Sequence, residues 1–518
     1  MMKKMILYNL FLLLILACSS ESSTDTPPVD KDPSTEKPSE TLLIKNQNPL
    51  SVDFVGNGAQ WGGYELIENF TGVDDFNEAD WNTLKERIDF MRPSFMRIMV
   101  SAGWNYTNTD GAFQPEKGNN AFHRIMQYCT DNQITVMFGE WGHSYLNGDR
   151  NQVDETWLDH AVNYLDYLID TKGYSCIKYY NMINEPNGDW SSTNTDYDLW
   201  QKVASGFQSR LESKGLHQSV QLAGPDIAVF GDAGAVNWIT RSKSKFNEKL
   251  GLYDIHAYPT KSFVTEGGYL EMLKAYKGAI PEGEQIVLGE IGIKFYGADA
   301  DLQTENLNRI NADPYASDDS NMSVYDGTYA IDISDAMVQS MMAGFSGALV
   351  WDVDDAMYNK SGSGSGPDAK KLKRWGFWNI LGEEAFGGAS DEEIRPFFYP
   401  VSLLCRYFPK GADIYEVQLP DKKGLRAIAA KKGDTYTLAI VNSNFVAYDD
   451  LSIKAEDNFT FDGVSQYVCT SMPDGSFQAK VDANGFALPL EQDMSIPLDG
   501  KHKVNIPARS VIVLTNMP

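Results

Sequence analysis

Two glutamates in this 518-residue chain stand at the ends of short apolar runs, Glu185 after Lys178–Ile183 and Glu290 after Ile286–Leu288. Both runs have the aromatic or β-branched character of a buried strand. A carboxylate beside a buried strand costs desolvation free energy, so it needs a partner or a task. Two carboxylates that meet can serve as a proton-donating acid and as a base or nucleophile. The simpler alternative for Glu185, that it caps the helix that follows, stays open at this point.

The elements that would position these glutamates alternate between strand-like and helix-like patterns from about residue 52 to residue 408. This alternation is typical of βα units on a parallel sheet, and eight such units predict a (β/α)8 TIM barrel. A doubly wound open sheet is the rival, but Gly56 and Gly58 are followed by no helix start at the distance that a phosphate-binding turn requires. The predicted strands are Phe54–Ala59, Phe95–Val100, Ile134–Phe138, Lys178–Ile183, Val220–Ala223, Tyr253–His256, Ile286–Leu288 and Ala348–Trp351.

In a barrel, the ends of the strands and the loops that follow them share one face, where the chemistry takes place. Carboxylates, an arginine, a histidine and several aromatic residues occupy these positions. Aromatic rings around a polar centre are typical of sugar binding, because the C–H faces of a sugar stack on them. Besides the two glutamates, the candidate residues are Arg97, Trp104, Glu140, Trp141, Asn184, His256, Tyr258, Tyr296 and Trp351.

Taken together in strand order, these motifs resemble the clan A glycoside hydrolases, which are retaining enzymes. The resemblance covers about residues 56–406 and rests on Asn184-Glu185-Pro186, His256-Ala257-Tyr258, Gly289-Glu290-Ile291-Gly292, Trp351 and Arg97. The motif around Glu290 resembles family 5, whereas the β-rich C-terminal region resembles families 30 and 39. The chain departs from family 5 at Glu140-Trp141, where a histidine is expected.

The resemblance implies a role for each member of the pair. Glu185 would be the general acid/base and must carry a proton when substrate binds, whereas Glu290 would be the ionised nucleophile. Arg97 would favour the charge of Glu290, and Tyr258 would donate a hydrogen bond to it. In a retaining enzyme the two carboxyl groups lie roughly 5–5.5 Å apart, which gives a geometric test.

The resemblance also implies substrate contacts. Asn184 would bind the 2-hydroxyl of the sugar, and Trp351 would form the floor of the sugar site, with a cis peptide bond after it. His256 is expected beside the catalytic pair, although a buried structural histidine is the alternative. Glu140 is the rival for either catalytic role, and we interpret it as a substrate contact or as a partner of Arg97.

After residue 408 the helical periodicity stops and short β-rich runs follow, separated by turn signals. This pattern predicts an antiparallel β-sandwich over residues 409–518, after a barrel domain over residues 43–408. The sandwich is expected to pack on the barrel and stabilise it, with a sugar-binding role as the alternative.

The N-terminus has the pattern of a bacterial lipoprotein signal over residues 1–18. Lys3 and Lys4 precede an apolar run too short to span a bilayer, and Cys18 follows Ala17 as the residue to be lipidated. Residues 19–42 are rich in Ser, Thr, Pro and charged residues, which predicts a disordered tether. Glu21 and Asp25 resemble surface-export signals of Bacteroidota lipoproteins. We therefore expect a lipid-anchored outer-membrane protein exposed on the cell surface, with an ordinary secretory signal as the alternative.

The formal net charge of −27 and the isoelectric point near 4.6 argue against nucleic acids and anionic membrane surfaces as partners. No cofactor is expected, and no metal site, because no pair of the cysteines has metal-site spacing. The disulfide state of Cys129, Cys176, Cys405 and Cys469 stays open. Acidic clusters near Asp319 and Asp354 are more typical of solvated loops than of calcium sites.

These observations predict a monomeric hydrolase that cleaves β-linked polysaccharide internally and retains configuration. An exo-acting β-glycosidase on oligosaccharides is one alternative, because loop lengths do not separate a cleft from a closed pocket. A surface lipoprotein that binds glycans without cleaving them is the other. The retention of both Glu185 and Glu290 argues against the last, because a decayed site usually loses one carboxylate.

Overall fold

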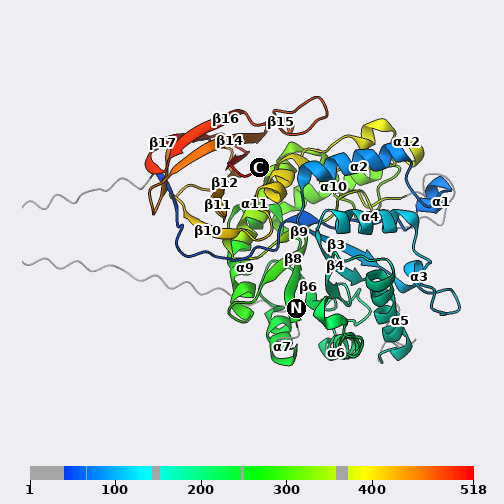
Figure 1. Cartoon of the computed structure of the whole chain (residues 1–518). Coiled ribbons are helices and arrows are strands. Elements are labelled where there is room, and N and C mark those ends of the chain that lie inside the picture. The colour runs from blue at the N-terminus through cyan, green and yellow to red at the C-terminus, as the bar shows by residue number, and fades with distance from the viewer. Residues whose placement is uncertain (1–39, 66, 143–151, 247–249, 357–370) are drawn as a thin grey trace, which may run out of the picture. The chain divides into compact units, whose positions relative to one another are not determined.

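The computed structural model describes residues 40–65, 67–142, 152–246, 250–356 and 371–518. These residues form a parallel barrel and a β domain that packs on it (Figure 1). The predicted signal segment with Cys18 and the tether up to residue 39 lie outside the described residues. Within the described part of the chain, no helix is long and apolar enough to cross a membrane.

An eight-stranded parallel sheet forms the barrel, in the order β2-β9-β8-β7-β6-β5-β4-β3. Gln60 and Arg97 pair in a parallel bridge, and the N–H of Trp61 donates to the carbonyl of Arg97 at 2.8 Å, which brings the two edges of the sheet together. The strands are β2 (Gly58–Ala59), β3 (Phe95–Val100), β4 (Thr135–Glu140), β5 (Ile177–Asn181), β6 (Gln221–Val229), β7 (Leu250–Ala257), β8 (Ile286–Ile291) and β9 (Ala348–Val350).

The predicted barrel is therefore confirmed, and each predicted apolar run overlaps a strand. The residues of β3, β4 and β8 are buried along their whole length, as parallel strands covered on both faces must be. Only the last two residues of the first run form a strand, and Gly56, earlier in that run, has a positive φ of 125° that does not fit an extended strand.

Helices cover the outside of the barrel (Figure 1). Their ends follow local capping rules: Asp196 caps the N-terminus of α6 by accepting from two backbone N–H groups, and Gly215 ends it with φ of 75°. The helices are α1 (Ile67–Thr71), α2 (Glu78–Met91), α3 (Ala102–Asn105), α4 (Asn120–Asp131), α5 (Glu155–Asp166), α6 (Tyr197–Lys214), α7 (Val236–Phe246), α8 (Lys261–Thr265), α9 (Gly268–Ala279), α10 (Ala300–Ala312), α11 (Gly327–Met342), α12 (Gly382–Ala385) and α13 (Phe398–Arg406).

The C-terminal domain is a ten-stranded curled sheet around its own apolar core. It is mixed rather than purely antiparallel, because β1 runs parallel to β13. Its strands are β1 (Thr41–Ile44), β10 (Asp413–Gln418), β11 (Leu425–Lys432), β12 (Thr435–Asn442), β13 (Tyr448–Ala455), β14 (Thr460–Ser471), β15 (Phe477–Ala479), β16 (Glu491–Pro497), β17 (Asp499–Ile506) and β18 (Ser510–Thr515).

The domain boundary at residues 42 and 43 requires correction. The expected boundary divides β1 (Thr41–Ile44) between the tether and the barrel, but this strand pairs with β10 and β13 of the β domain. Leu42 and Ile44 are buried in the core of that domain. Because the partner strands lie about 370 or more residues further along the chain, a short apolar segment beside a polar tether gave no local sign of this pairing.

Helix α11 forms the main contact between the barrel and the β domain. It packs against β11, β12 and β14, and nearly every residue of the helix is buried. A helix buried all around sits inside the protein rather than on its surface. Arg509 of the β domain forms a buried ion pair with Asp332 of α11, with 2.7 Å between Nη1 and Oδ1. The expectation that the β domain packs on the barrel is thus confirmed.

The four cysteines at positions 129, 176, 405 and 469 are free and buried. Burial raises the pKa of the Cys129 thiol well above its ordinary value, with a smaller contribution from neighbouring Cys176. These thiols behave as small apolar core residues.

Candidate active site

Glu185 lies in the loop that follows β5, and its backbone adopts the left-handed conformation with φ of 47°. This conformation costs a non-glycine residue on the order of 1 kcal/mol, so the surroundings must hold it. The N–H of Glu185 donates to the carbonyl of Asp226 at 3.1 Å. The carboxylate accepts from Trp190 Nε1 at 2.8 Å and lies 3.1 Å from His256 Nδ1. Glu185 is therefore oriented by residues of β6, β7 and its own loop, and the helix α6 that follows is capped by Asp196 instead.

Glu290 lies within β8, and its side chain is 6% exposed. Its Oε2 accepts from the hydroxyl of Tyr258 at 2.6 Å, and its Oε1 accepts from Nη1 of Arg97. His256 Nδ1 lies 3.6 Å from Oε2. A carboxylate with two donors and a neighbouring cation is stabilised in its charged form.

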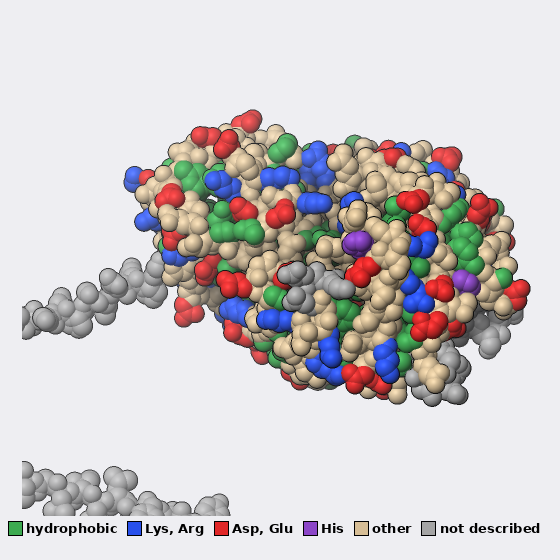
Figure 2. All heavy atoms as spheres, turned by 60° about the horizontal axis from the view of Figure 1, so that its bottom comes forward, with side chains coloured by type: hydrophobic (Ala, Val, Ile, Leu, Met, Phe, Trp, Pro, Cys, Tyr) green, Lys and Arg blue, Asp and Glu red, His purple; other side chains and the backbone are tan. Residues whose placement is uncertain are grey.

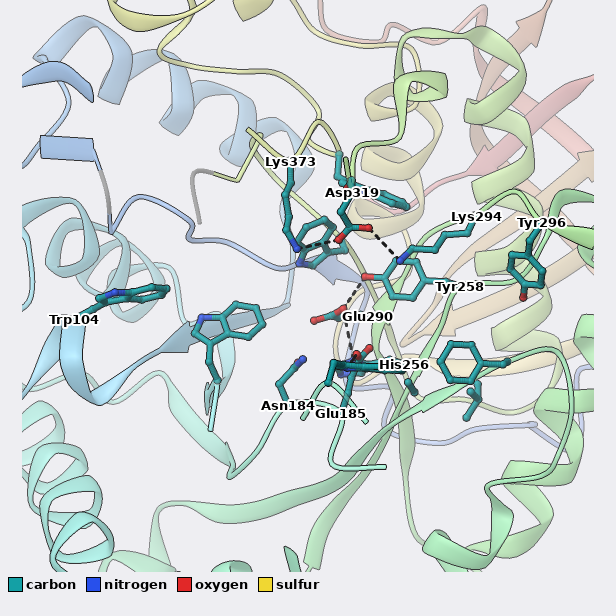
Figure 3. A pocket seen from close by; sticks show the side chains of 17 residues that line it. Trp104, Asn184, Glu185, His256, Tyr258, Glu290, Lys294, Tyr296, Asp319 and Lys373 are labelled. Carbon is teal, nitrogen blue, oxygen red and sulfur yellow. Dashed lines mark hydrogen bonds and ion pairs between the residues drawn. The ribbon is translucent and has the colours of Figure 1, made fainter. Parts of the chain in front are cut away.

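The two carboxylates face each other across His256. One oxygen of Glu185, one oxygen of Glu290 and a ring nitrogen of His256 all lie within 4.8 Å of one another. Figure 3 shows Glu185 and Glu290 converging on the middle of the pocket. Because the gap is short, a group bound between them can be protonated from one side and attacked from the other.

Arg97, on β3, connects Glu290 to a second carboxylate. The guanidinium is fully buried, donates to Asn184 Oδ1 at 2.8 Å, and forms an ion pair with Asp226 at 3.1 Å. Burial lowers the pKa of Arg97, but Asp226 and Glu290 outweigh it, so the net shift is upward. Arg97 is thus a permanent cation behind the pocket floor.

His256 is fully buried and bonded on both nitrogens. Nε2 lies 2.6 Å from Asp226 Oδ1, and Nδ1 faces Glu185 and Glu290. Burial lowers the pKa of His256, but the opposing effects of Asp226 and Glu290 raise it well above its ordinary value. Burial also raises the pKa of Asp226, but His256 and Arg97 bring it down to about 2. The imidazole is therefore a cation paired with the ionised carboxylate of Asp226.

Asp254, on β7, completes this network. Its Oδ1 accepts from the N–H of Gly289 at 2.7 Å, and a Cβ on Gly289 would stand 2.4 Å from the same carboxylate. Only glycine allows this close approach. Burial, followed by the charge of Asp226, raises the pKa of Asp254 well above its ordinary value. Asp254 therefore carries a proton and supports Asp226 without adding a second buried negative charge.

A cavity of about 850 Å³ opens in front of the two glutamates. It contains the predicted residues Trp104, Trp141, Asn184, His256, Tyr258, Tyr296 and Trp351 in its lining. Trp104 and Tyr296 stand at opposite sides of the view in Figure 3, with the glutamates between them. The peptide bond between Trp351 and Asp352 is cis, as the resemblance implied.

Glu140 lies behind the pocket rather than in its lining, so its expected role is corrected. Successive side chains of a strand point to opposite faces, and Trp141 takes the face toward the pocket. Glu140 is fully buried and accepts hydrogen bonds from the hydroxyls of Tyr106 and Tyr180. Arg97 forms its ion pairs with Glu290 and Asp226.

Several residues of the site were not predicted. Asp226 and Asp254 had a usable signal, because each is a carboxylate within or next to a buried strand. Lys294, Asp319 and Lys373 had none, because they come from loops that only the fold brings together. The lining also contains Trp190, Phe230 and Trp375.

Two groups of side chains come close enough to hold a metal ion, Glu185 with His256 and Glu290, and Asp226 with Asp254 and His256. Both share His256, whose nitrogens already face carboxylates. Arg97 adds a fixed positive charge beside them. The electrostatics of the site therefore disfavour an additional cation.

No protein-family model matches this chain, and no curated protein matches it in sequence. Solved structures match it over almost its whole length. A conserved exported protein from Bacteroides fragilis aligns with a TM-score of 0.60 at 12% identity, over 92% of this chain and 100% of that one. A GH39 β-xylosidase from Caulobacter crescentus aligns with a TM-score of 0.56 at 12% identity, over 92% of this chain and 100% of that one. A GH30 endoxylanase from Clostridium papyrosolvens aligns with a TM-score of 0.55 at 11% identity, over 92% of this chain and 99% of that one.

These similarities show that the chain has the barrel-and-β-domain fold of the GH30 and GH39 structures. At such low identity these similarities establish the fold alone. The chemistry follows from how the chain's own side chains are arranged.

Proposed function

We propose that the protein is a retaining glycoside hydrolase that cleaves β-glycosidic bonds, with Glu185 as general acid/base and Glu290 as nucleophile. The observation that carries the proposal is the facing pair of carboxylates, with oxygens within 4.8 Å of one another. Retaining enzymes separate the carboxyl groups by roughly 5–5.5 Å, whereas inverting enzymes need roughly 6.5–9.5 Å to hold a water.

The surroundings of each glutamate support these roles. Arg97 and Tyr258 both donate to Glu290, which favours an ionised nucleophile that attacks the anomeric carbon. Glu185 lies at the more open side, with 14% of its side chain exposed, where a leaving-group oxygen can reach its proton. After departure of the leaving group, Glu185 takes a proton from water, and the water hydrolyses the glycosyl–Glu290 ester.

Aromatic side chains support an endo-acting mode on a polysaccharide. Trp104, Trp141, Phe230 and Tyr296 all line the pocket. Trp104 and Tyr296 lie on opposite sides of the glutamates (Figure 3). Several stacking platforms suit a chain of sugars better than a single residue. Endo-cleavage of a β-linked polysaccharide releases oligosaccharides of mixed length early, whereas exo-cleavage releases a single small product, so product size over time distinguishes them.

The catalytic assignment is tested on a panel of β-linked polysaccharides and aryl glycosides. Glu290→Gln is expected to abolish turnover, and Glu185→Gln to slow it strongly, with partial recovery on substrates whose leaving group needs no proton. Glu140→Gln serves as the matched control, because this glutamate lies behind the lining, and it should only reduce activity. Full activity of Glu290→Gln would overturn the assignment, and binding without hydrolysis across the panel would support a non-catalytic glycan-binding protein.

We also propose that Cys18 is lipidated and anchors the protein at the cell surface. The basic and apolar residues before Cys18 support this, together with an exported protein among the matching structures. Fatty-acid labelling of the wild type that disappears in Cys18→Ser, together with surface accessibility to protease in intact cells, would test the anchor.

A further inference from the structure

Two lysines from separate loops converge on one wall of the pocket. Lys294 follows β8, and Lys373 lies between β9 and α12. Both reach Asp319: Lys373 Nζ lies 2.9 Å from Oδ2, and Lys294 Nζ lies 3.4 Å from Oδ1. Figure 3 shows the lysines on either side of Asp319, next to Tyr258 and Glu290.

The lysines lie over the rings that surround the nucleophile. Lys373 Nζ is 5.3 Å from the centre of the Trp351 ring, and Lys294 Nζ is 4.9 Å from that of Tyr258. Such contacts hold the side chains against the pocket wall. A sugar placed on Trp351 beside Glu290 would therefore have both ammonium groups within reach of its substituents.

One carboxylate does not balance two ammonium groups. Burial raises the pKa of Asp319, but Lys373 and Lys294 outweigh it and lower the net value, so Asp319 is ionised. The cluster of Lys294, Asp319 and Lys373 thus carries one excess positive charge. The side chains of Lys294 and Lys373 remain 44% and 25% exposed, so an incoming anion can reach them.

This local excess contrasts with the rest of the protein, whose formal net charge is −27. Figure 2 shows acidic and basic side chains interspersed over the face it presents. A cationic cluster inside a pocket, where low-dielectric walls focus the field, attracts an anion in spite of an acidic exterior.

From this geometry we propose that the cluster of Lys294, Asp319 and Lys373 recognises an anionic substituent, so that the substrate contains an acidic sugar. The substituent is a carboxylate, as in a uronic acid, or a sulfate ester, because both present the oxygens that an ammonium group binds. This inference rests on the proposed glycoside hydrolysis and specifies its substrate class.

A structural clamp is the competing explanation, in which Asp319 merely ties two loops together. The two explanations predict different changes in the preference for acidic over neutral substrates when these residues are replaced. If the cluster only holds the loops, Lys373→Met and Asp319→Asn should impair acidic and neutral substrates in parallel. If it binds an anion, Lys373→Met lowers the preference for the acidic substrate, whereas Asp319→Asn raises it by removing the competing carboxylate.

The test measures initial rates on paired polysaccharides, namely glucuronoxylan and hyaluronan against their carboxyl-reduced forms, and a sulfated β-glycan against its desulfated form. At least one acidic member should be cleaved faster than its neutral counterpart by about tenfold, the effect of one charge-assisted contact. Lys373→Met and Lys294→Met should each remove most of that preference. Lys371→Met is the matched control, because Lys371 donates to the carbonyl of Ala316 outside the pocket lining and should keep the wild-type ratio.

Comparing the carboxylate-containing substrate pairs with the sulfated pair identifies which anion is recognised. Equal or faster cleavage of the neutral member in every pair would overturn the inference while leaving the glycoside hydrolase assignment intact. If no polysaccharide is cleaved, the proposed function fails, and the inference is then judged by calorimetric binding of the acidic and neutral members to the full chain. Equal binding of both members would overturn it.

Discussion

Replacing Asp226 with asparagine should lower the pKa of His256, so that the imidazole loses its positive charge more easily. The loss of this charge beside Glu290 should then reduce catalysis. Asp226 is fully buried, and its Oδ1 lies 2.6 Å from His256 Nε2. Asparagine has nearly the same shape, so the substitution removes charge with little change in volume. Arg97 loses one partner but keeps Glu290, Asn184 and Gln60.

The magnitude follows from the short distances around His256. Its Nδ1 lies 3.1 Å from Glu185 Oε1 and 3.6 Å from Glu290 Oε2. At the 3.6 Å that separates His256 Nδ1 from Glu290 Oε2, a unit charge pair is worth about 5 kcal/mol at an effective dielectric constant near 20. Because Arg97 continues to stabilise Glu290, we expect only part of this interaction energy to be lost from transition-state stabilisation. The expected effect is a loss of about 10–100-fold in kcat/KM, or about 1.4–2.7 kcal/mol.

The pH dependence has a definite sign. In the wild type, burial lowers the pKa of His256, but Asp226 and Glu290 raise it well above the ordinary 6.5. The stability from this charge is therefore fully present below about pH 6.5 and is lost only as the pH rises through the raised value. Without Asp226 the pKa falls, so the variant should lose activity with rising pH earlier than the wild type.

The assay is the pH profile of kcat/KM, measured together with the ring nitrogen resonances of His256 by NMR. Thermal unfolding is followed in parallel, because breaking a buried ion pair costs about 3–5 kcal/mol. Asp198→Asn, a change of an exposed aspartate that pairs with Arg241, is the matched control. An Asp226→Asn variant with the wild-type pH profile and a His256 that stays protonated would refute the argument.

Two further predictions concern a hydrogen bond and a buried acid. Tyr258→Phe removes the hydroxyl that donates to Glu290 at 2.6 Å. Because a charge-assisted hydrogen bond is worth about 1.5–3 kcal/mol, kcat should fall about 10–150-fold with little change in melting temperature. An unchanged kcat would contradict this expectation. Burial, with a contribution from neighbouring Asp355, raises the pKa of Asp354 from 3.8 to about 8. The folded state therefore holds a proton that the unfolded state releases, and the stability it contributes is present below about pH 4 and lost as the pH rises toward 8. Melting temperatures between pH 5 and 8 should fall less steeply in Asp354→Asn than in the wild type, and an equal slope would contradict the burial argument.

The positions of the barrel strands could be predicted because their signal is local. Each strand is a short apolar run, and parallel strands buried on both faces are apolar along their length. The local signal is weaker in the β domain, because the burial patterns of β13, β16 and β17 alternate irregularly with exposed polar residues. Glu140 shows a second limit of prediction from sequence. A shift of one residue along a strand decides whether a side chain points into the pocket or away from it.

The sequence alone determined which residue types stand at the ends of the strands, and so placed Glu185 and Glu290 on one face of a barrel. Chain periodicity is enough for that step, because parallel strands of one barrel end at the same side. Only the tertiary structure decided that Asp226 and Arg97 surround His256 and Glu290, since they come from four different strands. It also decided that β1 joins the β domain and that Lys294 and Lys373 share Asp319. Pairing across such sequence separations depends on packing of the whole chain, whereas periodicity reports only on neighbours.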